Sequence, residues 1–268
     1  MFSNELSIAK KIAQKAGNFL IDQRKKNKSI TVEVKAINDF VTKIDKQAED
    51  LIVESLKKTF PDYGIMAEEN YSDKTIPDSL YWVIDPLDGT TNYIHNFPSY
   101  CVSIGLCENK KPVMGVIYDP TRDEMFSAQK DKGAFLNRIP INVSLIKNMK
   151  GSLIGTGFPF RNFPIIDNYL DCFSSILKKC QGIRRPGAAA IDLAYVACGR
   201  LDGFWEHGLQ PWDCAAGSII IKEAGGKVTD FQGGDDYLFS RTLIASNTLV
   251  HSEIQDIVSS SMPIKYPY

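Results

Sequence analysis

Residues 81–92 constrain the fold of this chain more than any other stretch of its sequence. The stretch begins with an apolar run long enough for a buried strand, continues with Asp85 and Asp88 three residues apart, and ends in Gly-Thr-Thr-Asn, which suits the start of a helix. Pro86 restricts its own φ and favours an extended backbone at Asp85. We therefore expect a buried strand that ends in a tight turn over residues 85–88, with both carboxylates at its carboxyl end.

The two carboxylates of this turn would repel each other unless a cation lay between them, and Mg2+ is a hard cation that such oxygen ligands suit. Directly after the turn, the backbone N–H groups of Gly89 and Thr90 would lie at the positive end of a short helix, where an anion such as phosphate binds. The same letters also suit an Asp-Gly hairpin turn whose acids are solvated. This stretch alone leaves both interpretations open.

Helix-forming and strand-forming patterns alternate along the rest of the chain, which indicates an α+β or α/β layered fold. In the first half we expect helices at residues 5–26 and 42–58, a polar loop at residues 35–39, strands at residues 31–34, 65–67, 81–84, 101–107 and 112–118, and a short strand ending at residue 128. In the second half we expect strands at residues 153–156, 201–206 and 242–246, and helices at residues 165–179, 188–198, 211–224 and 249–258. The strands between residues 101 and 128 would form an antiparallel half.

The length of the chain favours one compact unit of two lobes over two independent domains, because 268 residues is near the size at which a single core begins to split. The hydrophobic content of 44% and the charged content of 24% are ordinary for a soluble globular protein. We expect an N-terminal α+β lobe at residues 1–145 that carries the metal and phosphate motifs, a C-terminal α/β lobe at residues 146–262, and a frayed tail at residues 263–268.

Charge and cysteine usage exclude several classes of protein. The formal net charge is -1 and no basic block is long enough for a nucleic-acid footprint, so nucleic acid is disfavoured as a partner. The amino terminus lacks a basic start followed by an apolar run, and no stretch has membrane-spanning length, which favours a cytoplasmic protein without a membrane partner. The six cysteines show neither metal-ligand spacing nor a disulfide framework and are expected to be reduced and mostly buried.

Acids elsewhere in the chain suit the predicted metal site. Glu68 and Glu69 follow the strand at residues 65–67, either as a solvated strand end or with one of them joining Asp85, since a second strand would deliver its acid at the same edge of a sheet. Asp213 falls in the first turn of a predicted helix, where the helix dipole favours a carboxylate.

Four acids form an oxygen-only set that suits Mg2+ rather than zinc: Glu68, Asp85, Asp88 and Asp213. The three histidines have no zinc-ligand spacing and are expected at the surface or at helix ends. A hard cation beside a phosphate cradle favours hydrolysis of a phosphomonoester by a metal-activated water, without a covalent step. Two other phosphate chemistries lack their motifs, because the acid pair does not have the Asp-x-Asp spacing of the haloacid-dehalogenase phosphatases and no Gly-Lys pair is followed by the Ser or Thr of a P-loop.

Three motifs, in this order and at these separations, resemble those of the inositol monophosphatase family of lithium-sensitive, Mg2+-dependent phosphatases. They are Ala67-Glu68-Glu69, Asp85-Pro86-Leu87-Asp88-Gly89-Thr90-Thr91-Asn92 and Trp212-Asp213-Cys214-Ala215-Ala216-Gly217. Residues 183–190 and 202–206 also resemble bacterial members of the family. The resemblance covers almost the whole chain and implies a layered αβαβα sandwich of the inositol monophosphatase and fructose-1,6-bisphosphatase type, and a homodimer.

The resemblance also implies which groups hold Mg2+ and which activate water. The first ion would be held by Glu68, Asp85 and the backbone carbonyl of Leu87, the second by Asp85, Asp88 and Asp213, and a weaker third ion would lie near Glu68. Glu68 and Thr90 would orient the attacking water, and Asp45 would support the Thr90 hydroxyl.

On the substrate side, the resemblance implies binding by residues of four segments: Asp88, Gly89, Thr90, Ala189, Glu206 and Asp213. The amides of Gly89 and Thr90 would hold the phosphate, and the other groups would surround a polyol leaving group. Lys35 lies where the family has a loop that closes over the site. Ala188 stands where relatives commonly carry Ser or Thr, so the preference for inositol over another sugar phosphate stays open.

The predicted activity is Mg2+-dependent hydrolysis of a phosphomonoester, with myo-inositol 1-phosphate as the substrate. A relative that acts on fructose 1,6-bisphosphate, histidinol phosphate or a 3'-phosphoadenosine nucleotide would share the metal motif and differ on the leaving-group side of the pocket. A regulatory binding protein that keeps the fold and docks on nucleic acid or on another protein is the alternative outside catalysis. Such a protein would have no chemical need for every metal ligand.

Overall fold

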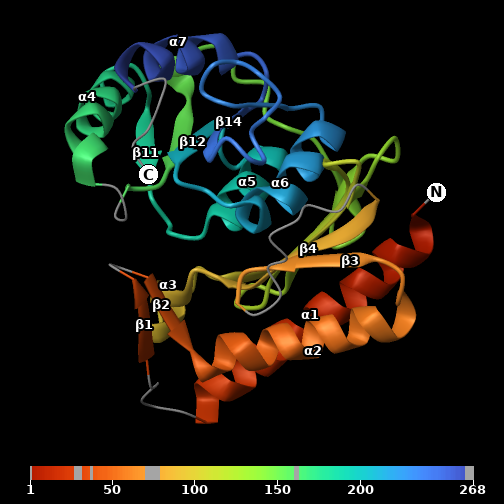
Figure 1. Ribbon diagram of the computed structural model, residues 1–268. Coiled ribbons are helices and arrows are strands. Elements are labelled where there is room, and N and C mark those ends of the chain that lie inside the picture. Colours follow the sequence, from red (N-terminus) through yellow and green to blue (C-terminus); the bar gives the residue numbers. More distant parts are fainter. Residues whose placement is uncertain (1, 27–31, 37–38, 70–78, 160–162, 263–268) are drawn as a thin grey trace.

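The computed structural model describes residues 2–26, 32–36, 39–69, 79–159 and 163–262. Within these ranges the elements form five layers in the order helices, sheet, helices, sheet, helices (Figure 1). The α+β layered sandwich expected from the sequence is therefore confirmed, while the predicted tail at residues 263–268 lies outside the described residues. None of the helices in these ranges has the length and apolar character that crossing a bilayer requires.

Two long amphipathic helices, α1 (Ser3–Lys26) and α2 (Lys43–Thr59), form the first layer. Their apolar side chains recur every three or four residues, so one face of each helix packs on the larger sheet. A hairpin of β1 (Val32–Ala36) and β2 (Asp39–Thr42) connects the helices in the sequence. Lys35, which was expected in a polar loop, therefore belongs to strand β1.

The larger sheet has seven strands in sequential order: β3 (Gly64–Ala67), β4 (Leu80–Asp88), β5 (Cys101–Glu108), β6 (Lys111–Asp119), β7 (Glu124–Gln129), β8 (Ala134–Leu136) and β9 (Ile139–Ile141). β3 and β4 run parallel, and each later pair of neighbours is antiparallel, as expected for this half of the chain. The parallel pair brings the ends of β3 and β4 to the same edge of the sheet.

The smaller sheet has five strands in the order β11 (Gly182–Arg184), β10 (Leu153–Thr156), β12 (Gly203–His207), β14 (Thr242–Ser246) and β13 (Lys227–Thr229). β10 runs parallel to both neighbours, whereas β14 is antiparallel to both of its own. Helices α4 (Ile166–Leu177) and α7 (His251–Ser261) cover its outer face (Figure 1). Three shorter helices lie in the connections: α3 (Thr90–Ile94), η1 (Met149–Gly151) and η2 (Phe163–Ile165).

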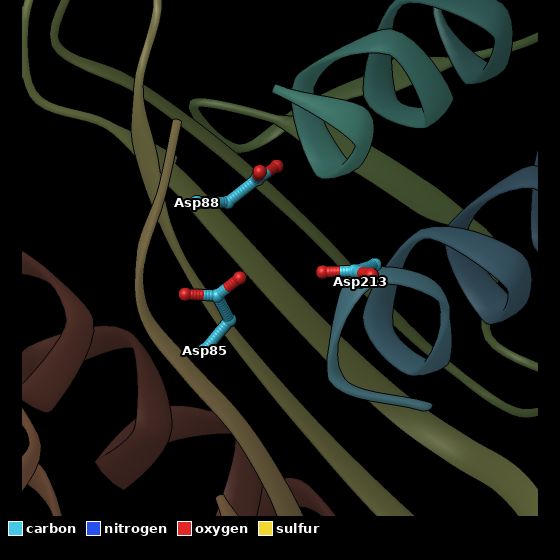
Figure 2. Close-up of side chains that lie close together, drawn as sticks. All are labelled: Asp85, Asp88 and Asp213. Atoms are coloured by element: carbon cyan, nitrogen blue, oxygen red, sulfur yellow. The ribbon is translucent and has the colours of Figure 1, made fainter. Parts of the chain in front are cut away.

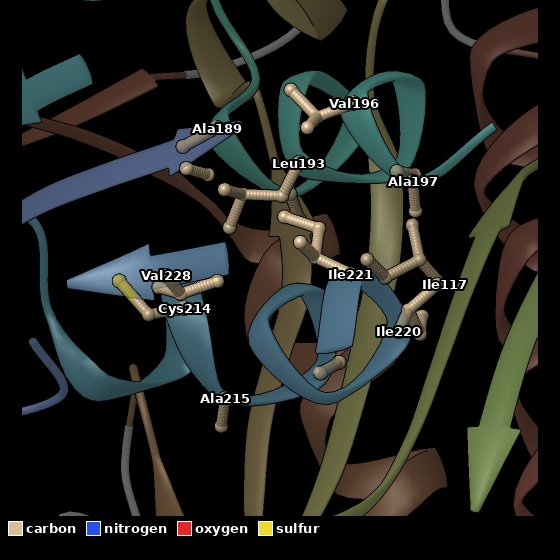
Figure 3. Packing of buried hydrophobic residues seen from close by; sticks show 14 of the residues in the cluster. Ile117, Ala189, Leu193, Val196, Ala197, Cys214, Ala215, Ile220, Ile221 and Val228 are labelled. Carbon is tan, nitrogen blue, oxygen red and sulfur yellow. The ribbon is translucent and has the colours of Figure 1, made fainter. Parts of the chain in front are cut away.

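The central layer consists of α5 (Ala189–Ala197) and α6 (Pro211–Glu223), which lie between the two sheets (Figure 1). Both helices are buried over most of their length, which is why they are apolar on nearly every side. Figure 3 shows Leu193 of α5 and Ile220 and Ile221 of α6 packed with Ile117 of β6, and Val228 of β13 belongs to the same cluster. The core therefore continues from one sheet to the other through these helices.

Side chains along β4 alternate between two cores. Trp82 and Ile84 pack under α1 and α2, whereas Tyr81 and Val83 point into the central cluster. The apolar run predicted as a buried strand is confirmed, and both of its faces are covered, as its lack of polar residues requires. Asp85, the next residue in this alternation, faces the central helices.

Two glycines of the larger sheet allow α6 to approach it closely. A Cβ atom added to Gly105 would lie 2.9 Å from Ala215 Cβ, and one added to Gly115 would lie 2.5 Å from the Ala216 carbonyl oxygen. The helix also presents alanines at this contact, so its backbone lies almost directly on the sheet. This close packing brings the first turn of α6 beside the end of β4.

The predicted lobe boundary falls between the two sheets, which span residues 64–141 and 153–246. However, α6 follows this boundary in the sequence and packs against strands of both sheets. The division into lobes at residues 145 and 146 stays a prediction, because the central cluster belongs to both halves.

Candidate active site

Three carboxylates from distant parts of the sequence meet between the sheets. Asp85 and Asp88 lie on β4, Asp213 lies in the first turn of α6, and one carboxylate oxygen of each lies within 4.8 Å of the others. Figure 2 shows the side chains of Asp85 and Asp88 on the side of β4 that faces the helix end carrying Asp213. The structure thus brings together three of the four acids that the sequence singled out as a metal set.

A β-bulge places Asp85 and Asp88 on the same side of β4. Asp85 pairs with Ser103 and Asp88 pairs with Cys101, so three residue steps on β4 oppose two on β5. Residues three apart on a regular strand would point to opposite faces, and the extra residue restores the common direction. The expected tight turn over residues 85–88 is wrong in this respect, because the strand continues through Asp88 with an irregular register.

The start of α6 holds Asp213 in place through a capping box. Pro211 occupies the first helical turn, and the Asp213 carboxylate accepts a hydrogen bond of 2.7 Å from the backbone N–H of Gln210. The Ser103 hydroxyl donates to the carbonyl oxygen of Trp212 at 3.3 Å, which ties this turn to β5. Asp213 is therefore fixed both to its own helix and to the larger sheet.

The carboxylates of this cluster repel one another. Burial raises the pKa of Asp85 well above its usual range, and the carboxylates of Glu68, Asp88 and Asp213 raise it further. Burial and the neighbouring Asp213 raise the pKa of Asp88 to about 7, although the backbone N–H of Ala190 donates to Asp88 Oδ2 at 2.7 Å and opposes the shift. Buried acids that repel one another are stabilised by a cation, and a donor set of carboxylate oxygens fits a hard divalent ion such as Mg2+.

Glu68 and Leu87, the other predicted metal ligands, border this cluster. Glu68 follows β3, where its backbone N–H donates to the carbonyl oxygen of Ile84 at 3.3 Å, and it lines the same cavity as the three aspartates. Leu87 lies in the bulge with its side chain in the core under α1 and α2, and its backbone N–H donates to Asp85 Oδ1 at 2.9 Å. The alternative acid, Glu69, bonds through its backbone N–H to a carboxylate oxygen of Glu49 at 2.7 Å.

The predicted pair of Thr90 and Asp45 is in contact. Thr90 Oγ1 lies 3.0 Å from Asp45 Oδ1 and 3.1 Å from the carbonyl oxygen of Leu87, and both oxygens can accept the hydroxyl proton. Asp45 is buried in the first turn of α2, so two segments 45 residues apart in the sequence meet at this hydroxyl. The contact orients the Thr90 oxygen beside the cavity that it lines.

Gly89 begins the short helix α3 with a φ of 92°, in the left-handed region. A Cβ atom at this position would also lie 2.8 Å from the Ser99 carbonyl oxygen, so both backbone conformation and space require glycine here. The sequence correctly predicted a helix start after the acid pair. The N–H groups of Gly89 and Thr90 lie at this start, where a helix offers its unpaired donors.

An open cavity of about 360 Å3 connects these groups with the smaller sheet. Its wall includes Ala189 at the start of α5 and Glu206 of β12, the two remaining predicted substrate residues. The Glu206 carboxylate occupies the space that a side chain at position 157 would need, so Gly157 leaves room for it. The cavity thus has the metal cluster on one side and a polar wall from the second half of the chain on the other.

Sequence patterns did not single out several other residues of this cavity, among them Asp192 and Arg185. Asp192 is the one charged residue of the apolar helix α5, and this contrast is a signal that the sequence offered. The expected surface or helix-end position is wrong for His207, which is buried in β12 and lines the cavity, whereas His251 lies at a helix end, at the start of α7, and is buried there. Burial lowers the pKa of both histidines to about 4.

Comparison with known proteins agrees with the fold and with the family resemblance. The sequence model of the inositol monophosphatase family matches residues 2–262. The Nus factor SuhB of Escherichia coli strain K12 is 40% identical over 245 residues, which cover 91% of this chain and 92% of the relative.

Solved structures of similar proteins have the same architecture. The extragenic suppressor protein suhB from Bartonella henselae superposes with a TM-score of 0.92 at 38% identity and covers 97% of this chain and 100% of its own. The inositol monophosphatase from Anabaena (Nostoc) superposes with a TM-score of 0.85 at 38% identity and covers 98% of each chain. The chain therefore belongs to the inositol monophosphatase family.

Proposed function

We propose that this protein is a Mg2+-dependent phosphomonoesterase that hydrolyses myo-inositol 1-phosphate to inositol and phosphate. The observation that carries the proposal is the meeting of Asp85, Asp88 and Asp213 within 4.8 Å, beside the amino-terminal end of α3. This arrangement offers carboxylates to a divalent ion and N–H donors to a phosphate in the same cavity.

The metal ligands would be Glu68, Asp85 and the Leu87 carbonyl for one ion, and Asp85, Asp88 and Asp213 for another. Mg2+, when bound, supplies positive charge that stabilises the phosphoryl group and makes water a better nucleophile. These carboxylates would keep two ions in a fixed position relative to the phosphate. Membership of the family supports this assignment.

Residues around the ions would bind the ester and accept the proton of the attacking water. The N–H groups of Gly89 and Thr90 would donate to phosphate oxygens, and Asp45 would keep the Thr90 hydroxyl turned so that its oxygen accepts a hydrogen bond from the attacking water. Glu68 would take the proton of that water. Glu206, Asp213 and the backbone near Ala189 would accept hydrogen bonds from the hydroxyls of the alcohol.

A panel of esters tests this function and its substrate. Purified protein should release phosphate from myo-inositol 1-phosphate with Mg2+, lose this activity in lithium, and show a lower kcat/KM for fructose 1,6-bisphosphate, histidinol phosphate and a 3'-phosphoadenosine nucleotide. A higher kcat/KM for one of these esters would make that ester the substrate and leave the proposed reaction, phosphomonoester hydrolysis, unchanged. Folded protein that binds Mg2+ and cleaves none of the esters would overturn the proposal.

A regulatory binding role is a second candidate, because the Escherichia coli relative is named as a Nus factor and not as a phosphatase. The two roles separate in a strain that lacks the endogenous gene for this protein. If the phosphatase alone matters, an Asp88→Asn variant should behave like the deletion. Normal growth with Asp88→Asn would favour a regulatory role in which the chain binds a protein or a nucleic acid.

The homodimer, the lithium sensitivity and the cytoplasmic location implied earlier stay predictions. Light scattering of the purified protein would check the first of them, with a mass twice that of one chain as the expected result.

A further inference from the structure

Asp192 is a buried acid in the wall of the cavity that the proposed mechanism does not use. Its side chain is 1% exposed, it lines the cavity from α5, and its Oδ1 atom has no hydrogen-bond partner among the residues that the structure describes. An unsatisfied carboxyl of this kind costs free energy in the folded state. A ligand in the cavity that forms a hydrogen bond with the carboxyl would offset this cost.

The described residues around Asp192 do not supply a hydrogen-bond partner for Oδ1. Gly155 lies beside this oxygen, because a Cβ atom added to Gly155 would lie 3.7 Å from Asp192 Oδ1. The same atom would lie closer to apolar carbons, at 2.9 Å from Leu201 and 3.0 Å from Phe204. Glu206 and Asp88 repel a negative charge on Asp192, whereas the Arg185 guanidinium attracts it without a hydrogen bond to Oδ1. Because Asp192 lines the cavity, a partner for its carboxyl would come from the cavity side.

Another buried acid shows what a satisfied carboxylate looks like in this protein. Asp119 accepts hydrogen bonds from the Thr121 N–H at 2.8 Å, from the Thr121 hydroxyl at 2.7 Å and from the Arg122 guanidinium at 2.8 Å. Asp119 closes its own loop and is not part of the cavity wall. Asp192 is as buried as Asp119, but its Oδ1 has no such partner among the described residues, which favours a ligand over a structural role.

We propose that Asp192 is a specificity-determining residue that forms a hydrogen bond with a hydroxyl of the alcohol leaving group, next to Glu206. The inference rests on the proposed phosphomonoesterase function and names the class of ester, a polyol phosphate rather than an aryl phosphate. A hydroxyl suits this position because it can donate to a carboxylate and accept from a carboxylic acid. Asp192 and Glu206 would together form the polar wall that recognises the alcohol.

The test compares two esters in variants of Asp192. The esters are myo-inositol 1-phosphate and 4-nitrophenyl phosphate, whose aryl leaving group has no hydroxyl to donate. In Asp192→Leu, the ratio of kcat/KM for the inositol ester to kcat/KM for the aryl ester should fall about 10- to 100-fold, the range expected for a lost hydrogen bond to a charged group. Asp192→Asn keeps an oxygen acceptor and should lose less.

Thermal stability separates recognition from a structural role. Both Asp192 variants should melt no lower than the wild type, because each removes a buried carboxyl whose Oδ1 has no hydrogen-bond partner among the described residues. Asp119→Asn is the matched control, and it should melt lower while leaving the ratio of the two esters unchanged. An unchanged ratio in both Asp192 variants would overturn the inference alone, whereas a wild-type protein that cleaves neither ester with Mg2+ would overturn the phosphatase proposal and the inference with it.

Discussion

Asp88 is a proposed metal ligand, and the pKa of its carboxyl is raised to about 7. An unfolded Asp has a pKa of about 3.9, so between these values the folded protein binds more protons than the unfolded chain. The stabilising contribution of this group is therefore complete at about pH 4 and is lost as the pH rises to about 7. Without divalent ions, the protein should lose stability in this window through Asp88.

Asp88→Asn should remove this pH dependence and the response to Mg2+ together. In EDTA the variant should melt higher than the wild type at pH 7.5, and the difference should shrink toward pH 4. Added Mg2+ should raise the Tm of the wild type more than that of the variant, and the variant should lose at least about 100-fold in kcat. Asp256→Asn, at an exposed site on α7, is the control; a similar pH profile in both variants would contradict the assignment.

Thr90 is a second residue whose role can be isolated, because its hydroxyl contacts Asp45 and the Leu87 carbonyl. Thr90→Val keeps the shape and removes the hydroxyl, so kcat should fall about 100-fold, a typical loss for a group that positions a proton transfer. The free energy of unfolding should also fall by about 1–3 kcal/mol, because buried acceptors lose a donor. Thr90→Ser should recover most of both quantities in kinetic and urea-unfolding measurements. Equal losses in Val and Ser would assign the effect to packing instead.

At the scale of elements, the position of α6 depends on glycine in the sheet beneath it. A Cβ atom on Gly115 would lie 2.5 Å from the carbonyl oxygen and 2.7 Å from the Cα of Ala216, so Gly115→Ala should push α6 away from the sheet. Overpacking of this kind costs about 1–3 kcal/mol, and the shift would also move Asp213 from Asp85. Both the Tm and kcat should fall.

Gly151→Ala is the matched control for this shift. A Cβ atom there would meet its nearest neighbour, Ile146, at 3.5 Å, which is an ordinary contact. Normal activity of Gly115→Ala at an unchanged Tm would show that α6 tolerates the added methyl group, and that its close approach to the sheet does not position Asp213.

Sequence patterns predicted the long elements well and the short ones poorly. Helices α1, α2 and α6 and strand β14 lie close to their predicted ranges, because each has a periodic apolar face, a continuous apolar run or clear end signals. Strands β8, β9, β11 and β13 have three residues each, too few to show any period, and were not predicted. These strands form because they pair with neighbours in the sheet, and single-sequence patterns contain no information on that pairing.

The bulge in β4 shows the same limit within the site. Pro86 correctly indicated an irregular backbone at the acid pair, but local preferences do not distinguish a turn from a bulge inside a longer strand. Residue type and a helix-start position placed Asp213 in the predicted metal set, and the family resemblance assigned it to one ion, but neither gives its distance from the pair. Asp192 was missed because a single acid in an apolar helix has meaning only once its surroundings are known.

At the scale of the whole molecule, two buried histidines connect folding to acid conditions. Burial lowers the pKa of His207 and His251 to about 4, compared with about 6.5 in an unfolded chain. The unfolded state therefore binds more protons between these values, so their stabilising contribution is complete above about pH 6.5 and is lost as the pH falls to about 4. Acid should weaken the protein in this window.

His251→Gln tests this effect, since the ring of His251 lies 2.9 Å from both the Thr229 and the Ser246 hydroxyl oxygens. The variant should be less stable than the wild type at pH 7 and lose less on going to pH 4.5 in urea-unfolding measurements. The exposed His95 offers the control, and His95→Gln should keep the slope of the wild type. A wild-type slope in His251→Gln would show that other groups carry the acid sensitivity.

The three aspartates come from both sides of the chain's midpoint, two from a strand of one sheet and one from a helix that packs against both sheets. Neither half contains a complete set, so a fragment made by cleavage of the backbone between the halves would be inert until it rejoined its counterpart. A divalent ion held by all three would join the halves as a noncovalent crosslink, and its strongest effect on unfolding would be to delay their separation.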